Sequence, residues 1–167
     1  MYTYSEFCGF KRADFKFEDR DALIVFPETP EPQGRWMMKM EYFGAFPDVE
    51  LQLLEKGFCL AYVENESRLA IKADCDRKAR FIAFAAEKYG LEKKCIPIGM
   101  SCGGICSVNF AARHPEYAAF LYLDAPVMNL LSCPMGFGVG ESLGENGSGW
   151  KRVWSCEDYK SKWGGNF

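Results

Sequence analysis

The chain has 167 residues, of which 49% are hydrophobic and 16% aromatic, so it is long and apolar enough to bury the core of one domain. Its formal net charge is -3 and its basic residues are scattered, which gives no reason to expect a nucleic-acid partner. The N-terminus lacks a basic segment followed by an apolar run, and no apolar run approaches the length of a membrane span. We therefore expect a cytoplasmic protein that makes no membrane contact.

The chain contains eight cysteines, most of which lie within apolar patterns. This placement predicts reduced, buried thiols, as is usual for a cytoplasmic protein, rather than a disulfide framework. Cys102 and Cys106 are four residues apart and share a helix face, but two cysteines without a second pair or a suitable histidine are a weak metal signal. We expect neither a metal nor an organic cofactor.

The first part of the chain reads as strands followed by a short helix. Residues 9–17 alternate polar and apolar side chains, which predicts a strand, and the apolar run 22–26 predicts a strand covered on both faces. Three prolines in residues 27–35 predict a loop. The secondary structure of residues 36–44, WMMKMEYFG, is ambiguous. Residues 47–57 begin with a proline and end with a glycine, which predicts a short helix.

Strands and helices then alternate. Residues 58–64, 95–99 and 118–127 are apolar runs that predict buried strands. Apolar residues recur at three- and four-residue spacing over 74–90, which predicts a helix. A further helix is expected over 103–114, where the following proline ends it. This alternation predicts a parallel sheet with helices on both faces.

The short segment Gly99-Met100-Ser101-Cys102-Gly103 joins the strand 95–99 to the following helix. A serine on such a sharp turn takes a strained backbone conformation, and glycines two residues before and after it relieve the crowding. The helix N-terminus favours developing negative charge, so the backbone N–H of Cys102 is a natural oxyanion donor. The alternative is a tight turn of small residues with no chemistry.

The chain resembles the N-terminal part of an α/β-hydrolase. Within that superfamily it most resembles uncharacterised bacterial esterase-like proteins that have a Trp-rich loop. The resemblance is carried by GMSCGG at 99–104, by 34–64 and by AAFLYLDAPV at 118–127. It implies an α/β fold with an α/β-hydrolase-type, mostly parallel sheet and helices on both faces, incomplete at the C-terminus. Residues 1–167 would form a single partial domain, with the sheet core over about 8–135 and a loop-rich tail over 136–167.

The resemblance also implies roles at the site. Ser101 would attack the carbonyl of a small-molecule ester or acyl substrate, and the Cys102 N–H would help to hold the oxyanion. A second N–H would come from the loop after Phe26, near Glu28. Asp124 is a candidate for the acid, although the family order of serine, acid and histidine places the acid and base beyond the residues that match.

The only histidine, His114, closes the helix that follows Ser101. Eleven or twelve helical residues at about 1.5 Å each carry it some 17 Å from the serine, which is too far for a hydrogen bond. A serine without a base is a weak nucleophile, so we expect this chain alone to be a poor catalyst. The apolar strand at 119–127 would also lie at a sheet edge, which indicates a missing C-terminal part or a partner chain that pairs there.

Other interpretations remain open. One is a non-catalytic α/β-hydrolase-like binding protein, or the product of a decayed gene. Another is a nucleotide binder with a phosphate loop, but Gly99, Gly103 and Gly104 lack the G-x-G-x-x-G spacing. The side chains of Trp36, Met37, Met38 and Met40 would either line an acyl pocket or pack in the core.

Overall fold

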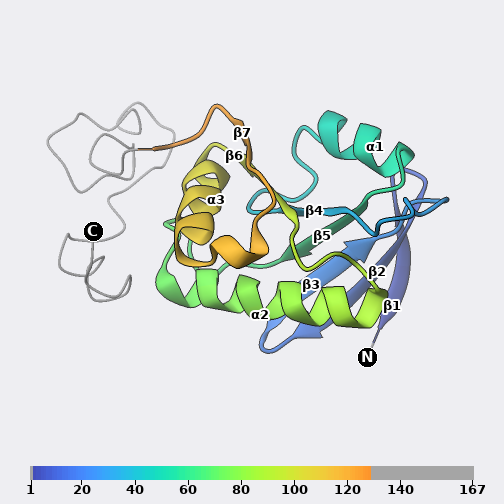
Figure 1. Ribbon diagram of the computed structural model, residues 1–167, viewed down its shortest axis with the longest axis horizontal. Coiled ribbons are helices and arrows are strands. Elements are labelled where there is room, and N and C mark those ends of the chain that lie inside the picture. The colour runs from blue at the N-terminus through green and yellow to red at the C-terminus, as the bar shows by residue number, and fades with distance from the viewer. Residues whose placement is uncertain (1, 129–167) are drawn as a thin grey trace, which may run out of the picture.

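The computed structural model of the protein describes residues 2–128, which form one seven-stranded sheet and its covering helices (Figure 1). The strands are β1 (Thr3–Phe7), β2 (Phe10–Phe17), β3 (Arg20–Val25), β4 (Trp36–Lys39), β5 (Cys59–Val63), β6 (Ile96–Met100) and β7 (Tyr122–Asp124). The helices are α1 (Asp48–Glu55), α2 (Lys72–Tyr89) and α3 (Cys102–Arg113), followed by the 3-10 turn η1 (Pro115–Tyr117). The predicted α/β fold is confirmed.

The sheet has the order β1-β2-β3-β5-β4-β6-β7 and is mixed. The strands β1, β2 and β3 form an antiparallel meander, and β3 also runs antiparallel to β5. The remaining strands, β5, β4, β6 and β7, are parallel to one another. Their carboxyl ends therefore share one edge of the sheet, and the carboxyl end of β3 lies at the opposite edge.

Helices cover both faces of the sheet: α1 lies on one face, and α2 and α3 lie on the other (Figure 1). Successive side chains of β4 alternate between these layers, because strand side chains point to opposite faces. Met37 packs with Leu54 of α1, whereas Trp36 and Met38 pack with residues of α2 and α3. All three, like Met40, are fully buried, so the structure places these side chains in the core.

The helix predictions are confirmed to within about two residues at each end. Helix α2 ends at Gly90, whose φ of 66° is the left-handed conformation that glycine adopts without strain. Its inner face packs against the meander, where Phe81 stacks on Phe15 and meets Phe17 edge to face. This contact fixes α2 across β2.

One strand prediction is wrong, and two strands of the structure were not predicted. Strand β1 was not expected, and its side chains are almost all exposed, so no apolar pattern marks it. The ambiguous segment 36–44 begins as the buried strand β4. The buried strand expected over 118–127 is wrong in extent and burial: β7 has only three residues, and Tyr122 is 39% exposed. Within residues 2–128, β7 pairs only with β6, and the predicted association through 119–127 stays a prediction.

The cysteines in the described part of the chain are free thiols, and all of them except the exposed Cys8 are buried. Burial raises the pKa of the Cys59 and Cys75 thiols to about 11, so they stay protonated and unreactive at neutral pH.

No helix within residues 2–128 has the length and apolar character needed to cross a membrane. The predicted loop-rich tail, 136–167, lies outside the described residues.

Candidate functional site

Ser101 occupies the turn between β6 and α3 in a backbone conformation that serine rarely adopts. Its φ is 52° and its ψ is -121°, a region that suits glycine and costs other residues about 1–3 kcal/mol. Three backbone hydrogen bonds hold it there. Ser101 N–H donates to the carbonyl of Asp124 (3.1 Å), and the Ser101 carbonyl accepts from the N–H groups of Val127 (2.8 Å) and Gly104 (2.9 Å). The strained conformation is therefore held by α3 on one side and by Asp124 and Val127 on the other.

Close approaches of neighbouring atoms require two of the glycines around Ser101, Gly99 and Gly104. A Cβ on Gly99 would lie 2.4 Å from the carbonyl oxygen of Gly103 and 2.4 Å from the Ser107 hydroxyl. A Cβ on Gly104 would lie 2.2 Å from the Cβ of Pro126. At Gly103 the nearest atom is 3.2 Å away, the Cβ of Glu41. The predicted relief of crowding is confirmed at Gly99 and is slight at Gly103, whereas Gly104, which was not predicted, has a close approach like that of Gly99.

Because the strain at Ser101 is local, its removal should stabilise the protein. We expect Ser101→Gly to raise the free energy of unfolding by about 1 kcal/mol, since glycine adopts this φ and ψ freely. Ser101→Ala keeps the strained backbone and should give no such gain. Urea denaturation of the three proteins tests this, and a Ser101→Gly protein less stable than Ser101→Ala would contradict it.

The loop after β4 lies against the start of α3. The backbone nitrogen of Glu41 would be 3.4 Å from a Cβ on Gly103, so this loop and the Ser101 turn are neighbours. Asn65, which follows β5, ties the loop down by donating its side-chain amide to the carbonyl of Met40 (2.8 Å) and to the Glu41 carboxylate. The loop and the turn thus meet at the carboxyl edge of the parallel strands, where ligands bind in open α/β sheets.

Tyr42 connects this loop directly to the residue after the serine. Its φ is 56°, in the left-handed region that several other non-glycine residues also occupy, and its hydroxyl hydrogen-bonds with the side chain of Cys102. Burial, together with this hydrogen bond, raises the pKa of Tyr42 to about 12, so the phenol stays neutral. The guanidinium of Arg68 lies over the Tyr42 ring, 5.0 Å from its centroid.

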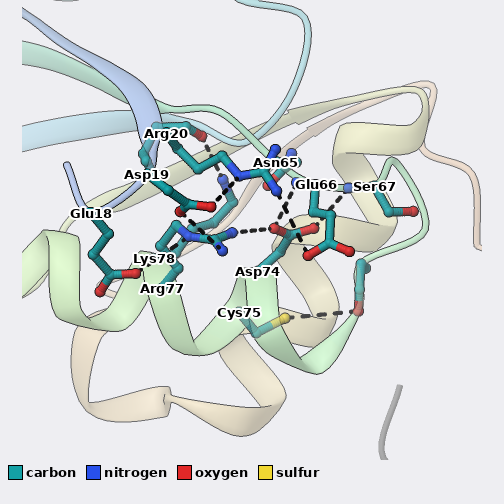
Figure 2. A network of polar contacts seen from close by, with 12 residues as sticks. Glu18, Asp19, Arg20, Asn65, Glu66, Ser67, Asp74, Cys75, Arg77 and Lys78 are labelled. Carbon is teal, nitrogen blue, oxygen red and sulfur yellow. Dashed lines mark hydrogen bonds and ion pairs between the residues drawn. The ribbon is translucent and has the colours of Figure 1, made fainter. Parts of the chain in front are cut away.

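The loop that carries Asn65 and Arg68 is fixed from below by the buried carboxylate of Asp74 in α2 (Figure 2). Asp74 accepts hydrogen bonds from the backbone N–H groups of Glu66 (2.8 Å) and Ser67 (3.0 Å), and from Arg77 (2.7 Å). These charge-assisted bonds make the loop a rigid border of the site.

Lys78 of α2 is a fully buried cation, and its ammonium donates to the carbonyl of Val63 at the end of β5 (3.1 Å). Burial lowers the pKa of Lys78, while the nearby charges of Asp74 and Glu41 oppose that shift. The sequence analysis did not predict that Lys78, Asp74 and Arg77 are buried. Burial is predicted from apolar side chains at helical spacing, and charged side chains interrupt that pattern.

Two of the predicted site residues come together with Ser101, and one does not. Cys102 begins α3, and Asp124 ends β7 opposite Met100 in register. Glu28 follows β3, whose carboxyl end lies at the opposite sheet edge, and it lines a pocket with Cys8 and Leu54. The prediction that the loop near Glu28 supplies an oxyanion donor is therefore wrong.

The only histidine lies away from the serine, as the sequence predicts. His114 follows the last residue of α3, and its Nε2 is 3.0 Å from the carboxylate of Asp76 in α2. Its Nδ1 is 3.6 Å from Glu116. His114 thus ties α3 to α2 at the end of the helix remote from Ser101.

No protein-family model matches the chain, and no curated protein is significantly similar to it in sequence. Among solved structures, Cfl2 from Burkholderia cenocepacia is similar with a TM-score of 0.54 at 15% identity, over 87% of this chain and 52% of that one. A bacterial membrane phospholipase A has a TM-score of 0.48 at 19% identity, over 80% of this chain and 43% of that one. Enterochelin esterase from Shigella flexneri has a TM-score of 0.46 at 12% identity, over 64% of this chain and 32% of that one.

The chain thus spans about half the length, or less, of the structures that it matches. The likeness to Cfl2 extends over most of the chain and shows the fold. The sheet order and the strand–turn–helix at Ser101 agree with it. The chain has the α/β-hydrolase fold, and residues 2–128 comprise the part of that fold that carries the Ser101 turn.

Proposed function

We propose that the protein is a serine hydrolase that cleaves carboxylic esters, with Ser101 as its nucleophile. The observation that carries this proposal is the strained backbone of Ser101 on the turn between β6 and α3. Strained residues persist only where the surrounding structure holds them, and they cluster at active sites. A structural turn at this position would be more stable with glycine.

In the proposed reaction, the Ser101 Oγ attacks the carbonyl carbon of the ester as its proton passes to a base. The carbonyl oxygen becomes an oxyanion, held by the backbone N–H of Cys102 at the positive end of α3. We place the second donor in the loop after β4, whose Glu41 backbone lies against Gly103, instead of near Glu28. The alcohol then leaves with a proton from the base, and water hydrolyses the acyl-serine.

The base in this proposal is a histidine outside the present sequence, because the only histidine of the chain is engaged by Asp76 at the far end of α3. Asp124, at the same sheet edge as Ser101, is the candidate for the orienting acid. No cofactor takes part in this mechanism. We propose a cytoplasmic location, which the free cysteines of the described part support.

A fluorophosphonate probe followed by peptide mass spectrometry tests the proposal. We expect a phosphonyl adduct on Ser101, lost in Ser101→Ala and retained in Ser107→Ala, which removes a buried hydroxyl from the same helix. An adduct that is absent even at long exposure, or that forms elsewhere on the protein, would favour a non-catalytic binding role.

A further inference from the structure

Arg68 is the cation at the rim of the site. Its side chain is 51% exposed, and its Nε lies 3.6 Å from the Glu41 carboxylate, which is an ion-pair distance but no hydrogen bond. No hydrogen bond is found for its side chain among residues 2–128, and the Nε–Glu41 distance is the shortest between these two charged groups. About half of the Arg68 side chain is therefore open to the solvent, where a ligand can reach it.

Two contacts place Arg68 over the first turn of α3. Its guanidinium stacks on Tyr42, whose hydroxyl meets the side chain of Cys102. Its backbone carbonyl accepts a hydrogen bond from the thiol of Cys106 (3.8 Å), one helical turn further along. Because α3 starts directly after Ser101, these contacts place Arg68 at the same end of α3 as the proposed nucleophile.

Arg68 is held in place before any ligand arrives. Asp74 fixes the backbone of the preceding residues Glu66 and Ser67, and the Ser67 hydroxyl accepts from the N–H of Leu69 (3.1 Å). Stacking on Tyr42 restricts the side chain itself. A planar guanidinium that is already ordered loses less entropy on binding a carboxylate, which it matches with two parallel hydrogen bonds.

The nearby carboxylates do not fully neutralise the Arg68 guanidinium. The Glu41 carboxylate also accepts a hydrogen bond from the Asn65 side chain and interacts electrostatically with the buried Lys78. Glu66 has its own cation, Arg20, at 3.8 Å. Asp124 is exposed at the end of β7, and no ion pair joins it to Arg68 among the described residues.

We propose that Arg68 binds a carboxylate on the substrate, so that the site selects esters that carry a second, anionic group. This inference rests on the proposed function, because it places the ester carbonyl at Ser101. Arg68 would set specificity through its two terminal nitrogens and would take no part in bond breaking.

A binding experiment on Ser101→Ala protein tests the inference without turnover. The ligands are monoethyl succinate and its neutral isostere ethyl succinamate, titrated into ¹⁵N-labelled protein by NMR. We expect monoethyl succinate to bind about tenfold more tightly, in line with a charge-assisted pair at an exposed site. Arg68→Gln should abolish this preference, and Arg68→Lys should keep only part of it, since lysine lacks the fork.

Arg35 provides the matched control. Its side chain is 47% exposed, lies 5.1 Å from the Phe58 ring centroid and pairs with Glu31 at 3.0 Å, but it precedes β4 at the opposite sheet edge. Arg35→Gln should leave the preference unchanged. Equal binding of the two ligands, or a preference that survives Arg68→Gln, would overturn the inference. If the probe labels Ser101 of the unaltered protein but the two ligands bind equally, only the role of Arg68 is rejected. If monoethyl succinate is preferred but Ser101 is not labelled, only the hydrolase activity is rejected.

Discussion

We expect Gly99→Ala to destabilise the protein by about 3 kcal/mol, one of the largest effects of any single methyl group in this chain. The added Cβ would lie 2.4 Å from both the Gly103 carbonyl oxygen and the Ser107 hydroxyl. The carbonyl belongs to helix backbone and has no room to retreat, so the strand–turn–helix must open. Urea denaturation of the purified variant measures the loss.

Two other glycines make this expectation specific. Gly104→Ala should cost a comparable amount, because its Cβ meets Pro126 at 2.2 Å. Gly103→Ala has its nearest contact at 3.2 Å, and alanine favours helix, so this variant should change stability by less than about 1 kcal/mol. If all three variants lost equal stability, the close approaches described here would not explain the glycines.

The second large effect is expected at the buried ion pair between Lys39, at the end of β4, and Glu50 of α1. Both side chains are almost fully buried, at 4% and 3% exposure, and the Lys39 ammonium also lies 3.4 Å from the carbonyl oxygen of Ala45. Lys39→Met leaves the Glu50 carboxylate buried without its partner, so we expect a loss of about 3–5 kcal/mol in urea denaturation.

The double variant Lys39→Met/Glu50→Leu removes both charges and should recover most of that loss, since an apolar pair of similar volume is often as stable as a buried ion pair. Lys72 and Asp76 form an exposed pair on α2, at 51% and 30% exposure, and serve as the comparison. Lys72→Met should cost less than about 1 kcal/mol. A double variant as unstable as Lys39→Met alone would contradict a charge-burial origin of the effect.

The sequence predicted most of the fold because its periodic signals are strong. The three helices carry apolar spacing or end signals, and the buried strands β3, β5 and β6 are continuous apolar runs. It did not predict β1, because an exposed edge strand has no buried face to mark it. The four-residue strand β4 is buried on both faces, so only its neighbours β5 and β6 distinguish it from a helix.

The site was predicted in part, for a related reason. The glycine–serine spacing is local, so it located Ser101 and Cys102 correctly on a turn between a strand and a helix. The place of Glu28 depends on strand direction: β3 runs antiparallel to β5, and no local pattern reports this. Tyr42 and Arg68 come from loops that are far apart in the chain, and only the pairing of β4 with β5 brings them together.

The central claim is that Ser101 is a nucleophile whose base lies outside this chain, and imidazole tests both parts of it. The measurement is the rate of phosphonylation of Ser101 by the fluorophosphonate probe, with and without added imidazole. We expect slow labelling that imidazole accelerates, because free imidazole can accept the serine proton, whereas the one histidine of the sequence is held by Asp76 at the far end of α3. His114→Gln should label at the same rate as the unaltered chain. A Ser101 that stays unlabelled in imidazole, or labelling that depends on His114, would contradict the account.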